Sequence, residues 1–163
     1  MNDPTLLQAF WDACRASLPS LQLPAESPPA DHFCNNEPCA NELGDLVRQG
    51  IKTATCGLLW SYEAEGEPLP QPGDLSIVTD WEGRPLGLIE ITEVSIRPYN
   101  QVDAQFAYDE GEGDRSLAYW RQAHWDFFSR ECAQIGREPA EDMPLVCERF
   151  RLLYPLLDPV SRI

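Results

Sequence analysis

The residues best suited to chemistry in this sequence are a lysine and a threonine three positions apart. The stretch GIKTAT, residues 50–55, contains Lys52, the only lysine of the chain, and ends at Thr55. A hydroxyl becomes a nucleophile when a base takes its proton, and a desolvated lysine can have its pKa lowered toward neutrality. We therefore predict that Thr55 is a nucleophile and that Lys52, lining a cleft, is its base. A surface lysine without a function is the alternative.

A second group of reactive side chains lies in the loop YDEGEGDR, residues 108–115. Its carboxylates are those of Glu110, Glu112 and Asp114. A carboxylate can orient a lysine or transfer a proton, Gly111 and Gly113 let backbone approach a ligand, and Arg115 offers a planar donor for phosphate or a carbonyl. An ordinary solvated turn has the same composition, so both interpretations stay open.

Aromatic side chains could bind a base, because every nucleobase presents a π face. The candidates are Trp60, Tyr62, Tyr119 and Trp120, of which Trp60 and Tyr119 are the two predicted to touch a ligand. The aromatic residues within 119–128 recur at helical spacing, which is more typical of a core. His124 is predicted to be a packed or capping histidine and not a catalytic base.

The charge of the chain limits its partners. The sequence has 163 residues, with 12 basic and 27 acidic side chains and a net charge of -15. Nonspecific nucleic-acid binding needs Lys and Arg to displace counterions, so bulk DNA binding is not expected, whereas a small-molecule substrate is. The first residues lack a basic signal region, and no apolar run approaches the roughly 18 residues of a membrane span. We predict a cytoplasmic protein.

Six cysteines are spread through the chain without a framework spacing, which favours reduced thiols. His32, Cys34 and Cys39 match no standard zinc pattern. We therefore predict no metal and no cofactor.

The elements that must position these residues are predicted from periodicity and from turn signals. Asp3 is expected to cap the first helix, and Gly50 to end the second. Helices are predicted over residues 2–18, 37–50, 100–108 and 117–132. Strands are predicted over residues 52–60, 74–80, 85–98 and 145–154. A proline-rich connector (19–31) and an acidic loop (61–74) complete a fold of class α+β, with a small β-barrel that the C-terminal strand closes.

These motifs together resemble one protein family. GIKTAT matches the pattern G-x-K-x-x-T at Gly50, Lys52 and Thr55, and three further stretches agree in type and order: ANELGDLVRQG, EPLPQPGD and FAYDEGEGDRSLAYWRQAHWDFF. Over residues 33–155 the chain resembles the larger bacterial branch of the ASCH-domain family (activating signal cointegrator homology) in the PUA-like superfamily. The resemblance implies a single domain over 1–163, a PUA-like β-barrel with flanking helices, and an N-terminal helix (1–20) and connector packed on the barrel.

The resemblance also implies a function, hydrolysis of the amide bond of N-acylated cytidine nucleosides. It places the nucleophile at Thr55, the base at Lys52 and the acid at Glu110, with Glu112 as an alternative to Glu110. Glu112 and Arg115, with Trp60 and Tyr119, would bind the substrate. Lys52→Arg is expected to lose activity and to leave the melting temperature nearly unchanged. The alternatives are metal-dependent cleavage of single-stranded RNA, with Glu110, Glu112 or Asp114 as metal ligands, and a noncatalytic RNA- or nucleotide-binding module.

Overall fold

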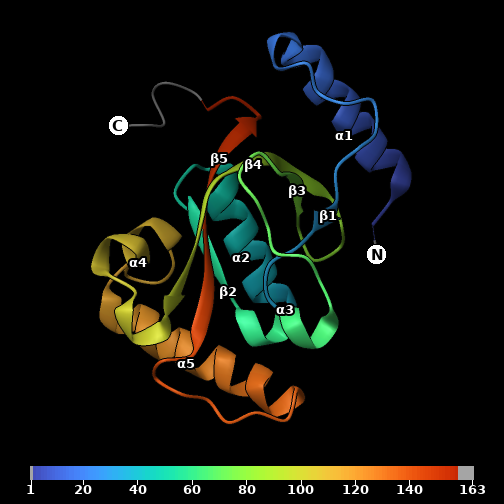
Figure 1. Cartoon of the computed structure of the whole chain (residues 1–163). Coiled ribbons are helices and arrows are strands. Elements are labelled where there is room, and N and C mark those ends of the chain that lie inside the picture. The colour runs from blue at the N-terminus through green and yellow to red at the C-terminus, as the bar shows by residue number, and fades with distance from the viewer. Residues whose placement is uncertain (1, 158–163) are drawn as a thin grey trace. The chain divides into compact units, whose positions relative to one another are not determined.

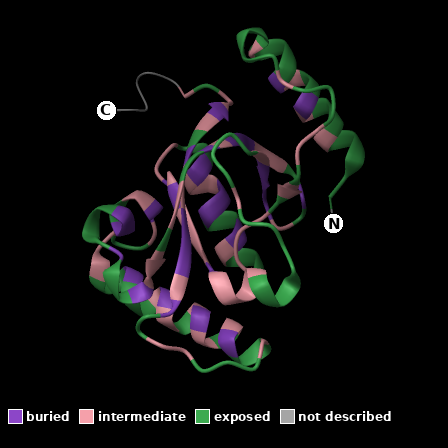
Figure 2. Ribbon diagram, in the orientation of Figure 1, coloured by how far each residue is buried: buried purple, intermediate pink, exposed green. Residues whose placement is uncertain are grey.

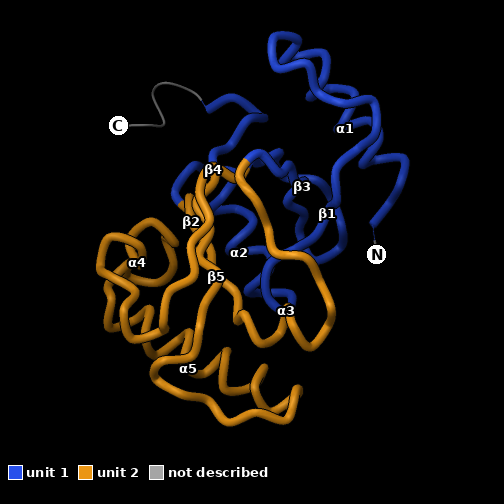
Figure 3. Tube along the Cα trace, viewed as in Figure 1, with its two compact units in different colours: residues 1–51, 73–90, 151–163 blue, residues 52–72, 91–150 orange. Residues whose placement is uncertain are grey.

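The computed structural model describes residues 2–157, which form five α-helices and five β-strands (Figure 1). They divide into two compact units (Figure 3). Unit 1 comprises residues 1–51, 73–90 and 151–163, and unit 2 comprises residues 52–72 and 91–150. Strands β4 (Pro85–Pro98) and β5 (Pro144–Tyr154) each continue from one unit into the other.

Two helices of unit 1 begin and end where the local sequence predicts. Helix α1 (Pro4–Ser17) starts after Asp3, whose carboxylate accepts a hydrogen bond from the amide of Thr5. Helix α2 (Glu37–Arg48) starts after Asn36, which caps the amide of Cys39. It stops before Gly50, whose φ of 77° lies in the left-handed region that favours glycine.

The sheet of unit 1 contains β1 (Ala30–Asp31), β3 (Leu75–Thr79) and the first part of β4. Strand β1 pairs parallel with β3, and β3 pairs antiparallel with β4 around a bulge at Val78/Thr79. The core is apolar and includes Trp11 and Cys14 of α1, which lie on the face that the sequence spacing predicts. Figure 2 colours the buried residues of this helix purple.

Unit 2 holds the remaining elements around a second apolar core. They are β2 (Ala54–Leu58), α3 (Leu59–Glu65), α4 (Ala104–Glu110), α5 (Leu117–Gln134), and the parts of β4 and β5 in residues 91–150. Strand β2 pairs antiparallel with β5, from Ala54 opposite Arg149 to Leu58 opposite Leu145. Ser116 caps α5 by accepting from the amide of Tyr119.

The α+β class is confirmed, and the predicted closed barrel is wrong. The strands form one open sheet in the order β1-β3-β4-β5-β2. Closure requires a continuous ring of paired strands, and this order ends at β1, which is only two residues long.

Two short elements were missed because their sequences lack a clear periodic signal. Strand β1 lies in the proline-rich connector, where two residues are too few for alternation. Helix α3 was interpreted as strand and acidic loop, although Gly66, with a φ of 66°, marks its end.

The reduced-thiol prediction is wrong for one pair of cysteines. Cys34 and Cys39 form a disulfide across the start of α2, while Cys14, Cys56, Cys132 and Cys147 are free. The short spacing did not reveal the pair, because a disulfide depends on how the loop before α2 folds back.

Among residues 2–157, no helix combines the length and apolar character needed to cross a membrane.

Candidate functional site

Both backbone hydrogen-bonding groups of Thr53, the residue after Lys52, are paired, and these bonds hold Lys52 in place. The amide of Thr53 donates to the carbonyl oxygen of Asp109 at 2.8 Å, and the carbonyl oxygen of Thr53 accepts from the amide of Phe150 at 3.1 Å. Asp109 is held in turn by Arg149 of β5, whose Nη1 lies 2.6 Å from Oδ2. This arrangement fixes the end of α4 beside the start of β2, within unit 2.

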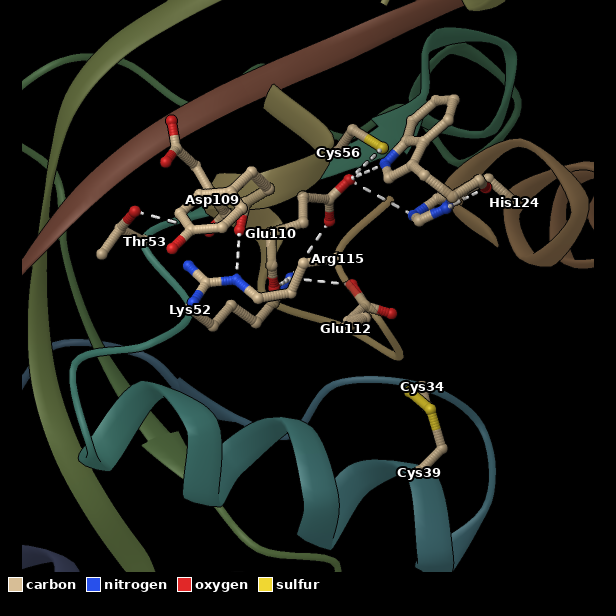
Figure 4. A network of polar contacts seen from close by, with 12 residues as sticks. Cys34, Cys39, Lys52, Thr53, Cys56, Asp109, Glu110, Glu112, Arg115 and His124 are labelled. Atoms are coloured by element: carbon tan, nitrogen blue, oxygen red, sulfur yellow. Dashed lines mark hydrogen bonds and ion pairs between the residues drawn. A yellow bond between two sulfur atoms is a disulfide. The ribbon is translucent and has the colours of Figure 1, made fainter. Parts of the chain in front are cut away.

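The ammonium group of Lys52 is buried and bound by two carboxylates (Figure 4). Its Nζ lies 3.0 Å from Oε1 of Glu110 and 3.0 Å from Oε2 of Glu112, and it donates to the carbonyl oxygen of Glu110 at 3.3 Å. The side chains of Lys52 and Glu110 are each 1% exposed, and that of Glu112 is 19% exposed. Lys52 therefore does not stand free on the surface, while its place in a cleft stays a prediction.

A left-handed turn brings both glutamates to the same cation. Helix α4 ends at Glu110, and Gly111 and Gly113 have φ angles of 77° and 58°. A Cβ atom on Gly113 would also lie 2.4 Å from the ring of Tyr119. Glycine is thus required at position 113 by backbone conformation and by space.

Three polar groups converge on the second oxygen of Glu110. Oε2 accepts a hydrogen bond from Nε1 of Trp120, lies 3.3 Å from Nε2 of His124, and accepts from the thiol of Cys56 at 3.4 Å (Figure 4). Nδ1 of His124 lies 2.9 Å from the carbonyl oxygen of Trp120, and the two rings stack with centroids 4.2 Å apart. A carbonyl oxygen only accepts, so Nδ1 carries a proton and Nε2 points at Glu110.

The burial of opposite charges determines the protonation states. Burial alone would lower the pKa of Lys52, but the charges of Glu110 and Glu112 outweigh it and raise that pKa. Burial alone would raise the pKa of Glu110, but the charges of Lys52 and His124 hold it well below its usual value. These shifts favour a protonated Lys52 and an ionised Glu110 at neutral pH, whereas the sequence predicted a lysine with a lowered pKa.

The charge of Glu110 raises the pKa values of both His124 and Cys56. Burial alone would lower the pKa of His124, but the charge of Glu110 outweighs it and raises that pKa. Burial, and then the charge of Glu110, raise the pKa of the Cys56 thiol well above its usual value. A thiol in this state is a poor nucleophile because little thiolate is present.

Thr55 lies on the other side of β2 from Cys56. Neighbouring residues of a strand point to opposite faces, and Cys56 is the one that contacts Glu110. Thr55 is half-buried and pairs in register with Glu148 of β5. Within residues 2–157 its hydroxyl makes no hydrogen bond, so its role as nucleophile stays a prediction.

The predicted substrate-binding residues other than Glu112 make contacts of their own. Trp60, in the first turn of α3, has the guanidinium of Arg137 4.4 Å from its ring centroid. Arg115 adopts a left-handed φ of 66°, lies 3.5 Å over the ring of Tyr108 and donates to the carbonyl oxygen of that residue. Tyr119 is 45% exposed beside Gly113. Their binding roles stay predictions.

Three residues of the network were not predicted to contact Glu110. Trp120, His124 and Cys56 each have a type that is common in cores. Trp120 was considered only for stacking on a base, and His124 was expected only to pack or cap. The spacing of Trp120 and His124, one helical turn apart on α5, was the available signal. It becomes informative only when the acid that both residues contact is known.

Comparisons with known proteins identify the family. The family model of the ASCH domain matches residues 29–154 of this sequence. An ASCH domain structure from Lactobacillus crispatus JV V101 is 44% identical, with a TM-score of 0.84 over 93% of this chain and 96% of that chain. Protein EF3133 from Enterococcus faecalis V583 is 35% identical, with a TM-score of 0.79 over 92% of this chain and 91% of that chain. A comparison with curated proteins found no match. The resemblance seen in the sequence is confirmed, and the chain belongs to the ASCH domain family, with its PUA-like fold.

Proposed function

We propose that this protein hydrolyses the amide bond of N-acylated cytidine nucleosides. The observation that carries the proposal is the buried ion pair between Lys52 and Glu110, in which Nζ lies 3.0 Å from Oε1. Strongly perturbed ionisable groups held together out of solvent are typical of catalytic sites. The residues come from two separate segments, GIKTAT and the EGEG turn, which carry the family resemblance.

The ion pair can supply both an acid and a base. If the proton on Nζ moves to Oε1, the pair becomes a neutral amine and a neutral carboxylic acid. A substrate that closes the site lowers the local dielectric and penalises separated charges, which favours this neutral form. Lys52 is then able to accept a proton, and Glu110 is able to donate one.

The reaction proceeds in two steps through an acyl-enzyme. Thr55 Oγ attacks the acyl carbonyl carbon while Lys52 takes the hydroxyl proton, and Glu110 protonates the leaving amino group as the C–N bond breaks. Glu110, now ionised, takes a proton from water, which attacks the new ester. Lys52 returns a proton to Thr55 Oγ as the ester bond breaks, which leaves a neutral amine and a protonated Glu110. Transfer of that proton from Oε1 to Nζ then restores the ion pair. Because Thr55 points to the face of β2 opposite Cys56, the scheme requires β2 to change conformation on substrate binding, so that Thr55 Oγ comes within reach of Nζ.

Cys56 and Glu112 are alternatives to Thr55 as the nucleophile and to Glu110 as the acid. Cys56 is the nucleophile closest to Glu110, but its raised thiol pKa disfavours attack. Glu112 also contacts Lys52 and could replace Glu110 as the acid. Its greater exposure makes it better suited to move aside or to contact the substrate, so we assign proton transfer to Glu110.

Metal-dependent RNA cleavage and noncatalytic RNA or nucleotide binding are the competing functions. The net charge of -15 disfavours a polyanionic substrate, whereas a free nucleoside carries no phosphate. We therefore favour a small-molecule nucleoside.

The test compares N-acetylcytidine and single-stranded RNA as substrates, each with magnesium and with a chelator. Release of cytidine that is insensitive to the chelator and lost in Thr55→Ala supports the proposal. Thr55→Ser and Cys56→Ser are the matched controls, because the first keeps a hydroxyl and the second removes the neighbouring thiol. RNA cleavage that needs magnesium, or cytidine release that survives Thr55→Ala, contradicts it. Binding of RNA or nucleoside without turnover supports the noncatalytic alternative.

A further inference from the structure

We propose that Cys56, Glu110 and His124 form a binding site for a divalent cation of the zinc class. The residues come from β2, the end of α4 and the middle of α5, all within unit 2. The inference concerns cation binding and goes beyond the proposed hydrolysis.

The donor atoms are of the right kinds and close enough together. Cys56 Sγ, a carboxylate oxygen of Glu110 and a ring nitrogen of His124 all lie within 4.8 Å of one another. Thiolate, carboxylate and imidazole are the three side-chain ligands that Zn²⁺ takes in proteins, with three protein ligands and one water as a common set. The thiol makes magnesium and calcium poor candidates, because both prefer oxygen ligands.

The neighbouring groups orient these ligands as a metal site requires. A histidine ligand usually donates its other ring N–H to a carbonyl or carboxylate. Here Nδ1 of His124 faces the carbonyl oxygen of Trp120 at 2.9 Å, which leaves Nε2 directed at Glu110. The indole of Trp120 holds Oε2 of the same carboxylate.

The hydrogen bonding around Oε2 leaves a place for a cation. Three polar groups converge on this one oxygen: the indole of Trp120, Nε2 of His124 and the thiol of Cys56. A carboxylate oxygen offers about two lone-pair sites, so it cannot satisfy all three groups. A cation bound by Sγ, Nε2 and Oε2 would make these atoms its ligands and remove this competition.

Lys52 does not compete with a cation for Oε2 of Glu110. Lys52 contacts Oε1, the other oxygen of Glu110, and Glu112 partly offsets its charge. The ammonium group therefore does not occupy the position of the cation.

Where the proposed hydrolysis also holds, the bound cation inhibits it, because Glu110 becomes a ligand and can no longer shuttle a proton. This consequence rests on the proposed function, whereas the binding site does not. The test of the site therefore uses binding and not activity.

The experiment titrates Co²⁺, a spectroscopic substitute for Zn²⁺, into chelator-treated full-length protein without reductant, so that the disulfide is preserved. We expect a thiolate-to-cobalt charge-transfer band that saturates at one equivalent and disappears when Zn²⁺ is added. Cys56→Ser should remove the band, and His124→Gln should weaken Co²⁺ binding at least about tenfold. Cys132→Ala, which alters another buried free thiol of unit 2, should leave the band intact.

Two results would overturn the inference. One is the absence of a thiolate band in the wild-type protein at a tenfold excess of Co²⁺. The other is a band that persists unchanged in Cys56→Ser. Circular dichroism verifies that each variant is folded, and if Cys56→Ser does not fold, unchanged Co²⁺ affinity in His124→Gln overturns it instead.

Discussion

Unit 2 contains a fully buried ion pair, whereas the ion pairs among the described residues of unit 1 each have at least one exposed side chain. In unit 1, Arg151 and Glu90 meet at 2.7 Å with side chains 58% and 27% exposed, and Arg84 meets Asp80 at a turn. In unit 2, Lys52 and Glu110 meet at a similar distance but are each 1% exposed. An exposed pair contributes little stability, and a buried pair is often no better than an apolar pair of the same size. The buried network is therefore poorly explained by stability alone, which is why we assign the chemistry to it.

The largest expected difference between the units comes from removing one partner of each pair. Lys52→Met leaves Glu110 buried beside no ammonium, and should lower the free energy of unfolding by about 3–5 kcal/mol. Arg151→Met, the matched change in unit 1, should lower it by about 1 kcal/mol or less. Urea denaturation measures both. Equal losses in the two variants would show that burial does not distinguish the pairs.

Exchanging one basic residue for the other type should give a smaller difference in stability loss between the two units. Lys52→Arg inserts a larger, planar group into a filled site, and should destabilise by about 1–3 kcal/mol. This revises the expectation from the sequence of a nearly unchanged melting temperature, because Lys52 is fully enclosed. Arg84→Lys, at an exposed position, should leave the melting temperature unchanged. Thermal melts of both variants test the contrast, and an unshifted Lys52→Arg would argue that the site is loosely packed.

The glycines of the two units provide a third contrast. Gly73 and Gly113 both have positive φ angles, but an added Cβ has nothing within 4 Å at Gly73 and meets the Tyr119 ring at Gly113. Both alanine variants should lose about 1–2 kcal/mol for the left-handed conformation. Gly113→Ala should lose about 1 kcal/mol more for the contact. Tyr119→Ala in that background should remove the excess, and a double-mutant cycle that shows no coupling would refute the contact.

The smallest expected effect is a pH dependence in unit 1. Burial alone would raise the pKa of Asp80, but hydrogen bonds from Arg84 outweigh it and lower that pKa below 3.8. A carboxyl with a lowered folded-state pKa contributes stability above pH 3.8 and loses it as the pH falls through the folded-state value. Asp80→Asn should therefore flatten the stability curve slightly below pH 4 and not near neutrality. Acid titration of both proteins measures this, and curves that run parallel below pH 4 would contradict it.

The sequence predicted those parts of the molecule that depend on local pattern. Strand β4 was predicted over the residues that it occupies, because its alternation is long and a turn precedes it. Lys52 and Glu110 stood out by type and by position in the resembling motifs. The contacts of Cys56, Trp120 and His124 with Glu110 were not predicted, since they depend on which faces of β2 and α5 meet the end of α4. The open sheet was missed for a similar reason, because strand periodicity does not specify which edges pair.

The most direct test of the proposed catalysis is a kinetic comparison of the two glutamates that bind Lys52. Glu110→Gln keeps the shape of the side chain and removes the proton acceptor, as does Glu112→Gln at the more exposed position. With N-acetylcytidine and metal-free protein, we expect Glu110→Gln to lose several orders of magnitude in kcat, while Glu112→Gln stays within about tenfold of the wild type. A folded Glu110→Gln that hydrolyses N-acetylcytidine at the wild-type rate would contradict it.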